Sequence, residues 1–208
     1  MLVIRMFLLL LLAFPTAQTR QVYANSLAED QPKHLAKAHL KNQQTNQRID
    51  LPVEIVERKD GDLDATSYIV MVTSGSLSEP HEKYDITGGV KLTVTMYYDE
   101  TWVGSHKVAI DRTNARWDKY DGTITITGAR VCSMVNTANP FLLKTECGTI
   151  GTPSLGVTYV QNPSWRGTYA VVDGLHYQES EANSTLTRGG SSWGLELCVA
   201  QGGGDMVL

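Results

Sequence analysis

The chain has 208 residues, with 18 lysine and arginine against 22 aspartate and glutamate side chains, which gives a net charge of −4. This mild acidity, without a basic patch beyond the N-terminal third, argues against a nucleic acid as the partner. The length leaves room for one domain with a sizeable core and a short N-terminal leader.

The first 24 residues have the pattern of a secretory signal peptide. Arg5 gives a positive start, residues 6–13 form an unbroken apolar run, and Val22-Tyr23-Ala24 offers a cleavage site after Ala24. The run is shorter than the roughly 20 residues that a membrane-spanning helix needs, so we expect no transmembrane anchor. We therefore predict a secreted protein, whose mature chain keeps 16 cationic and 22 anionic side chains, because Arg5 and Arg20 are lost.

Residues 25–65 are rich in Gln, Lys, Asp and Ala and poor in aromatic residues. Lys33, Lys37 and Lys41 recur every four residues, so a helix over 33–47 would carry them as one basic stripe. Such a stripe suits contact with an anionic cell surface, but its apolar side is weak, which favours a solvated leader. We predict a polar, partly helical or disordered leader over 25–65, followed by the folded domain over 66–208.

The sequence beyond residue 65 has the texture of β-strands. In the stretch 91–98, Leu92, Val94, Met96 and Tyr98 alternate with polar residues, which is the pattern of a half-buried strand. Similar runs occupy 66–73, 106–110, 122–135, 155–161, 167–172, 184–188 and 191–200, with turn residues between them. About eight short strands without intervening helices predict an all-β fold, an antiparallel β-sandwich or partly closed barrel.

One acidic stretch begins like a calcium-binding loop. It is Asp60-Gly61-Asp62-Leu63-Asp64, but Ala65 stands where glycine should turn the chain and Met71 where a bidentate glutamate should follow. We expect a solvated acidic loop, with a looser calcium site as the alternative. The histidines have no zinc-ligand spacing, so we expect no metal centre and no other cofactor.

Four aromatic residues lie among polar and charged neighbours at or near expected loops. They are Trp102, Trp117, Tyr120 and Trp165. Flat rings beside hydrogen-bonding groups on the rim of a sandwich suit stacking against sugars or a protein surface, whereas a ring that caps the core is the alternative at each position. We predict that these residues bind the partner, a cell-surface or extracellular glycan or protein.

Three cysteines in an exported chain are informative because the compartment is oxidising. Cys132 and Cys147 enclose 14 residues and are the preferred disulfide pair. Cys198, in the last expected strand, could pair with either instead. In the preferred pairing it is a free thiol or forms an intermolecular disulfide.

Residues 190–194 fit G-x-S-x-G, the turn that presents a nucleophilic serine in many hydrolases. That turn leads into a helix, but residues 195–199 alternate as a strand, and the last histidine, His176, precedes Ser192 rather than following it. Gly189 and Gly190 instead predict a tight β-hairpin. Carboxylates are plentiful on turns, yet no pair is singled out for glycoside hydrolysis, so we assign no catalytic residue.

The overall pattern resembles small, uncharacterised, β-rich exported proteins of Gram-positive bacteria. The signal peptide, the strand VKLTVTMYYDE followed by WVGSHKVAI, and the closing hairpin TLTRGGSSWGLEL carry this resemblance. It implies export and an all-β fold and brings no known activity.

We hypothesise a secreted, non-catalytic β-sandwich that binds an extracellular ligand through loop aromatics. A secreted glycan hydrolase that uses two turn carboxylates is one alternative, and an exported antagonist or inhibitor of other cells is another.

Overall fold

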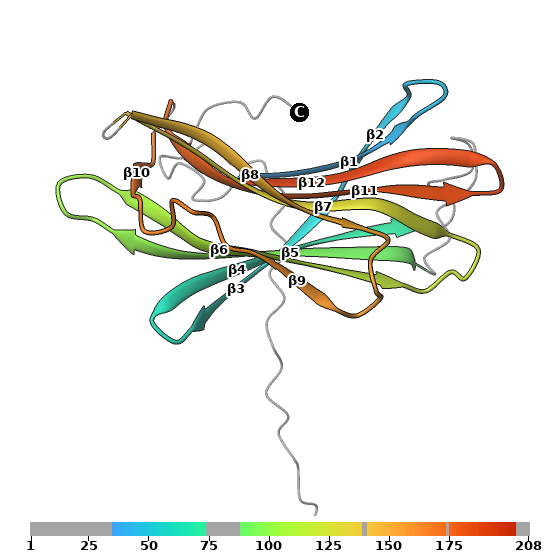
Figure 1. The fold of residues 1–208 in the computed structure, drawn as a ribbon, viewed down its shortest axis with the longest axis horizontal. Helices are drawn as coiled ribbons and strands as arrows, with labels where there is room; N and C mark the ends of the chain where they lie inside the picture. The colour runs from blue at the N-terminus through green and yellow to red at the C-terminus, as the bar shows by residue number, and fades with distance from the viewer. Residues whose placement is uncertain (1–34, 74–87, 139–140, 174, 203–208) are drawn as a thin grey trace, which may run out of the picture.

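The computed structural model describes residues 35–73, 88–138, 141–173 and 175–202. Within these ranges the chain forms twelve strands and no helix, arranged as two antiparallel sheets (Figure 1). The sheets pack face to face, so the predicted all-β sandwich is confirmed, with twelve strands where about eight were expected. The predicted signal peptide lies outside the described residues.

The first sheet has the strand order β2-β1-β12-β11-β7-β8. Its strands are β1 (Leu35–Asn42), β2 (Arg48–Leu51), β7 (Thr125–Ala138), β8 (Phe141–Gly151), β11 (Tyr177–Arg188) and β12 (Ser191–Gly202). The predicted hairpin between β11 and β12 is confirmed, with Arg188 opposite Ser191. Gly189 and Gly190 form its turn with φ values of 55° and 86°, as a two-residue turn of type I′ requires.

The second sheet has the strand order β10-β6-β5-β4-β3, and β9 also pairs with β6. Its strands are β3 (Val53–Asp60), β4 (Leu63–Thr73), β5 (Gly88–Thr101), β6 (Lys107–Lys119), β9 (Thr158–Gln161) and β10 (Ala170–Val171). The register between β5 and β6 shifts by one residue, because Tyr97 lies opposite Arg112 and Tyr98 opposite Ile110. Asp111 is therefore the extra residue of a β-bulge in β6.

Residues 35–60 form strands, so the predicted polar leader, with a helix over 33–47, is wrong for this part of the chain. β1 pairs with β12 along its whole length. Ala38 and Leu40 are buried in the core, and Lys37 and Lys41 alternate with them. A spacing of four residues is close to one helical turn but is also a multiple of the two-residue repeat of a strand. The folded domain therefore includes residues 35–65, ahead of the boundary predicted at residue 66.

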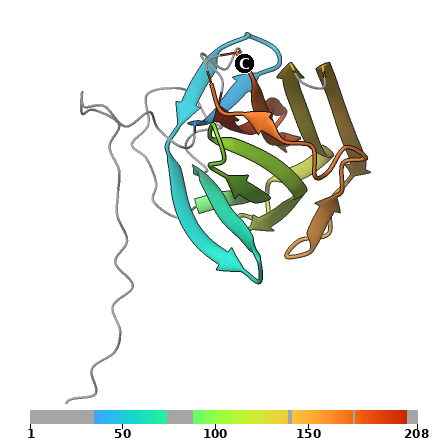
Figure 2. The ribbon, with the colours of Figure 1, turned by 90° about the vertical axis from the view of Figure 1, so that its left-hand side faces the viewer.

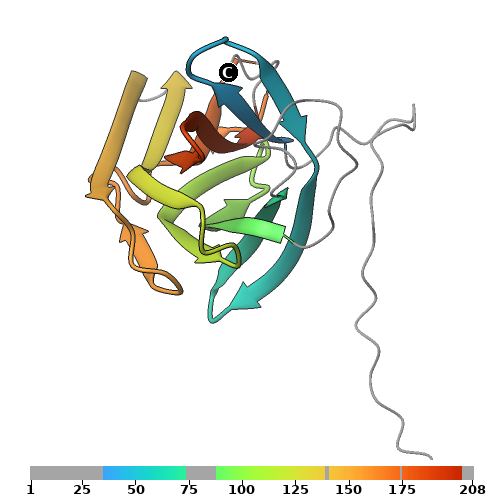
Figure 3. The same ribbon diagram turned by 90° about the vertical axis from the view of Figure 1, so that its right-hand side faces the viewer.

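The chain passes from one sheet to the other between β2 and β3, which only Pro52 separates (Figures 2 and 3). Proline has no N–H group and cannot continue a ladder of backbone hydrogen bonds, so one extended run is divided here into two strands. The crossing ties the two sheets together along one side of the sandwich.

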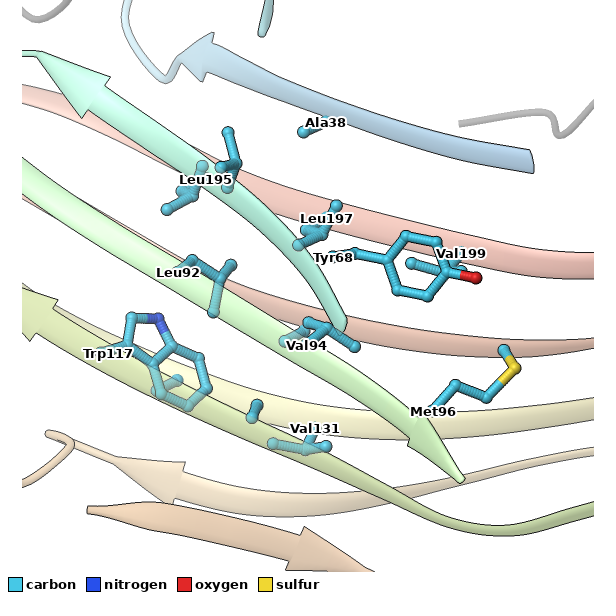
Figure 4. Packing of buried hydrophobic residues seen from close by; sticks show 14 of the residues in the cluster. Ala38, Tyr68, Leu92, Val94, Met96, Trp117, Val131, Leu195, Leu197 and Val199 are labelled. Carbon is cyan, nitrogen blue, oxygen red and sulfur yellow. The ribbon is translucent and has the colours of Figure 1, made fainter. Parts of the chain in front are cut away.

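The core lies between the sheets and is built from alternate residues of the strands (Figure 4). Leu92, Val94 and Met96 of β5 are fully buried, and so are Leu195 and Leu197 of β12 on the facing sheet. The alternation predicted for both strands is thus confirmed. Full burial of each such side chain contributes about 1.5–3 kcal/mol to folding.

The inner face of β11 carries polar residues among apolar ones. Its Ser180 hydroxyl lies 2.6 Å from the hydroxyl of Thr113, which lies 2.8 Å from that of Ser133. All three side chains are fully buried. Buried polar groups are tolerated where they find hydrogen-bond partners, so this chain of hydroxyls links the two sheets through the core.

Candidate functional site

Two of the four predicted binding aromatics belong to the core. Trp117 is fully buried on β6, and its Nε1 donates a hydrogen bond to the Ser184 hydroxyl at 3.1 Å. Trp165 is only 6 % exposed. Neither ring has a face available for stacking on a partner, so their predicted binding role is wrong, and each takes the alternative role within the core.

The other two predicted aromatics are exposed but lie far apart. Trp102 is 65 % and Tyr120 is 63 % exposed. Trp102 precedes the first residue of β6 and Tyr120 follows its last, so a strand of 13 residues separates them. The structure therefore does not bring the predicted aromatics into one surface, and each exposed ring must be considered with its own neighbours.

An open pocket of about 600 Å³ lies at the end of the sandwich that holds Trp102. The start of β6, the end of β7 and the segment around β10 enclose it, at the left-hand end of Figure 1. Its wall carries the charged side chains of Lys107, Asp173 and His176 and the hydroxyl-bearing side chains of Ser105, Thr137 and Tyr169. Its size is within the roughly 300–1,000 Å³ of small-molecule binding sites.

The side chains of Asp173 and His176 are hydrogen-bonded to each other in the wall of this pocket. The Asp173 Oδ2 atom lies 2.8 Å from His176 Nδ1. Asp173 Oδ1 accepts hydrogen bonds from the backbone N–H groups of Leu175 and His176 at 2.8 and 2.7 Å. Burial opposes the charged form of Asp173, but these hydrogen bonds outweigh it and lower the pKa of the carboxyl group. The pair fixes the orientation of the imidazole, whose Nε2 remains available to other groups.

Trp102 is held in place at the same end of the sandwich as the pocket. Its ring stacks on His106, with the ring centroids 4.0 Å apart and the planes inclined by 6°. His106 Nε2 lies 2.7 Å from Glu100 Oε1, within ion-pair distance though not aligned for a hydrogen bond. His106 also adjoins Ser105 and Lys107 of the pocket in the chain, and its carbonyl accepts the N–H of Val172 at 2.9 Å. One face of the Trp102 ring is thus backed by a fixed partner.

Gln178, a residue that the sequence reasoning missed, anchors the pocket wall from inside. This fully buried side chain accepts the Ile110 N–H at 2.5 Å and donates to the carbonyls of Val108 and Thr168 at 2.8 and 2.6 Å. It therefore connects β11, the bulged part of β6 and the segment that precedes β10. On the same wall, Tyr169 donates a hydrogen bond to Asp99. Nothing in the local sequence distinguishes Gln178 from a surface glutamine.

Glu146 holds the start of the segment between β9 and β10. Its carboxylate accepts hydrogen bonds from the backbone N–H of Ser164 at 2.7 Å and from the Ser164 hydroxyl, and it lies 2.5 Å from Lys144 Nζ. The bonds from Lys144 and Ser164 lower the pKa of Glu146 from 4.5 to about 2.

We expect Glu146→Gln to lower the free energy of unfolding at pH 7 and to have little effect near pH 2. A carboxyl group whose pKa is depressed in the folded state stabilises it above the unfolded pKa, and this contribution is lost as the pH falls through about 2. Urea unfolding at the two pH values measures the effect. Glu54→Gln, on the exposed strand β3, is the control, and an equal effect of both variants would contradict the prediction.

The predicted disulfide between Cys132 and Cys147 is confirmed. The two residues lie opposite each other on β7 and β8, so the bond ties the edge strand β8 to its neighbour. Cys198 forms no disulfide within the described residues and is 1 % exposed. Burial and the nearby carboxyl group of Glu179, with which it shares a hydrogen bond, raise the pKa of its thiol. Of the two predicted alternatives for Cys198, an intermolecular disulfide would first require the strand around Cys198 to open and expose the thiol to solvent.

We expect Cys198 to resist alkylation in the native protein, because the thiolate is the reactive form and both burial and a raised pKa suppress it. Iodoacetamide at pH 8 followed by mass spectrometry measures this, and the same reagent in 6 M guanidinium should modify Cys198 fully. Rapid modification without denaturant would show that the strand around Cys198 opens readily.

The calcium-like and serine stretches are both hairpin turns. Asp60 and Leu63 lie opposite each other at the end of the β3–β4 hairpin, and Asp60 Oδ2 lies 3.6 Å from Arg112. Ser192 is on β12, and its hydroxyl donates to Gln43 Oε1 at 3.0 Å. Among the described residues, no three His, Cys, Asp or Glu side chains are grouped to hold a metal ion.

The fold and this pocket define a two-sheet β-sandwich that has an open pocket with hydrogen-bonding groups and an exposed tryptophan at one end. No protein-family model matches the chain, and no curated protein is similar to it. Across the described ranges, no helix has the length and apolar character to cross a membrane.

Proposed function

We propose that the protein is a secreted, non-catalytic β-sandwich that binds an extracellular or cell-surface glycan at the end of the sandwich that holds Trp102 and the open pocket. The single observation that carries this proposal is the Trp102 ring, stacked on His106 and 65 % exposed at the same end of the sandwich as a pocket with hydrogen-bonding walls. The disulfide between Cys132 and Cys147 supports export, because such bonds persist in oxidising compartments.

A sugar presents apolar C–H faces together with a ring of hydroxyl groups. A flat indole that is fixed from behind loses little conformational entropy when a sugar face packs on it. The hydroxyl-bearing side chains that line the pocket, such as Ser105, Thr137 and Thr168, supply directional hydrogen bonds for the sugar hydroxyls. A stacking ring beside convergent polar groups is thus the combination that glycan recognition needs.

A glycan array probed with the mature protein tests this proposal. We expect binding to a defined set of glycans, and we expect Trp102→Ala to weaken it at least tenfold, because the stacking surface is lost. Tyr120→Ala is the matched control, since this ring is equally exposed at the far end of β6, and it should bind like the wild type.

Two outcomes would contradict the proposal. An array without any bound glycan would exclude a glycan as the ligand and would favour a protein partner. Release of reducing sugar from a bound glycan would show catalysis and would favour a hydrolase that uses the carboxylates at this end of the sandwich.

A further inference from the structure

The two full charges in the pocket, on Lys107 and on Asp173, differ in how far they are already engaged within the protein. Lys107, Asp173 and His176 are the charged or ionisable residues that line it. Both oxygens of Asp173 are already occupied, Oδ1 by two backbone N–H groups and Oδ2 by His176. Its negative charge is therefore largely satisfied within the protein and is poorly available to a ligand.

Lys107 differs from Asp173 because its ammonium group makes no hydrogen bond or ion pair with the described part of the chain. It is the first residue of β6, where Thr101 of β5 lies opposite on one side and Val171 of β10 on the other. Neither neighbour carries a charge that could neutralise the ammonium group. The Lys107 ammonium group is therefore the charge in this pocket that has no direct partner, although the whole chain has a net charge of −4.

We infer that the pocket binds an acidic sugar, with Lys107 holding the sugar carboxylate and the hydroxyl-bearing wall holding the sugar ring. This inference rests on the glycan-binding function proposed above and specifies the class of sugar. A lysine ammonium is a compact point charge, and the single negative charge of a sugar carboxylate matches it one to one. Asp173 directs the His176 imidazole, a second nitrogen donor when it is protonated, in the same wall.

The orientation of this wall is set before any ligand arrives. Thr168, which lines the pocket, is held through its carbonyl by Gln178, and His106 is held through its carbonyl by the N–H of Val172. The backbone of Lys107 is therefore held in place, because Lys107 is paired with Thr101 of β5 and Val171 of β10. Because the backbone at Lys107 is fixed, binding of an anion orders only the side chain, which costs less entropy than ordering a lysine on a mobile loop.

Isothermal titration with uronate oligosaccharides tests this inference. The probes are oligosaccharides of polygalacturonate, alginate and hyaluronan, and the methyl ester of each, which keeps the sugar shape and removes the charge. We expect at least one acid form to bind the wild-type protein at least tenfold more tightly than its ester. Lys107→Met should reduce the affinity for the acid to that for the ester and leave binding of the ester unchanged.

Lys91→Met is the matched control. Lys91 is on β5 opposite Asp118, near the end of β6 that is far from Lys107, so this variant removes one charge away from the pocket and should keep the preference for the acid. Equal affinity of the wild type for acid and ester, or a preference that survives Lys107→Met, would overturn the acidic-sugar inference and leave glycan binding intact. Failure of every acid and ester to bind would also overturn it, and the array then decides separately whether neutral glycans bind.

Discussion

Replacing Gln178 by leucine is expected to lower the free energy of unfolding by about 3–5 kcal/mol. Leucine fills a similar volume but forms no hydrogen bond, so the Ile110 N–H and the carbonyls of Val108 and Thr168 lose their partner inside the protein. An unsatisfied buried polar group costs about 1–3 kcal/mol, and three are affected here. Denaturant unfolding followed by tryptophan fluorescence measures the loss.

Gln178→Glu is the matched test of this explanation. The substitution keeps the shape of the side chain and the acceptor for the Ile110 N–H. It replaces the amide nitrogen, which in the wild type donates to the carbonyls of Val108 and Thr168, by a carboxylate oxygen that cannot donate. Burial and these carbonyls would raise the pKa of the new carboxyl group, so its contribution to stability is present at low pH and is lost as the pH rises through that raised pKa. We expect this variant to be more stable at pH 4 than at pH 7, relative to wild type. Wild-type stability of Gln178→Glu at pH 7 would show that the amide donor contributes nothing.

The same anchor explains how the interior could influence binding. Thr168 lines the pocket, and the hydrogen bond from Gln178 to its carbonyl joins it to β11. When that bond is lost, the segment before β10 has one fewer constraint, and the wall that faces the ligand is less well positioned. Gln178→Leu should therefore weaken glycan binding even at temperatures where the protein is fully folded.

The sequence predicts strands best where one face is apolar. On β5 and β12 the alternation from Leu92 to Tyr98 and from Trp193 to Val199 is uninterrupted, so the buried face could be read directly. β11 is different, because its inward positions include Gln178, Ser180 and Ser184. Their burial depends on partners on β6 and β7, which no local pattern reveals, so only the end of this strand was predicted.

The candidate site was predicted only in part for the same reason. Trp102 could be identified because it lies in a turn with polar neighbours, but Trp117 has equally polar neighbours and is buried. The charged neighbours of Trp117, Arg116 and Asp118, point outward from β6 while Trp117 points into the core. Whether such a tryptophan lies in a loop or in a strand that faces a second sheet is decided by the packing of the two sheets. Lys107 begins β6, whereas Asp173 and His176 belong to the segment between β10 and β11, and only the fold brings the two segments to one pocket.

Loss of the disulfide is expected to lower the free energy of unfolding by about 3 kcal/mol. Cys132 and Cys147 are 15 residues apart in the sequence, and a crosslink that closes a loop of this size restricts the unfolded chain by about that amount in the chain-entropy model. The Cys132→Ser/Cys147→Ser double variant removes the bond without leaving a new thiol. Urea unfolding compared with wild type measures the difference.

The reduced protein provides the decisive comparison, provided that Cys198 is replaced first. In a Cys198→Ala background no thiol remains that could exchange with the disulfide, and dithiothreitol then acts on a single bond. We expect reduction to lower the stability of this variant by the same 3 kcal/mol or so. Because β8 is an edge strand held by β7 alone within its sheet, its amide hydrogens should exchange faster after reduction, whereas those of the central strand β5 should follow only the change in global stability. Equal stability before and after reduction would mean that the β7–β8 hairpin stays closed in the unfolded chain without the bond.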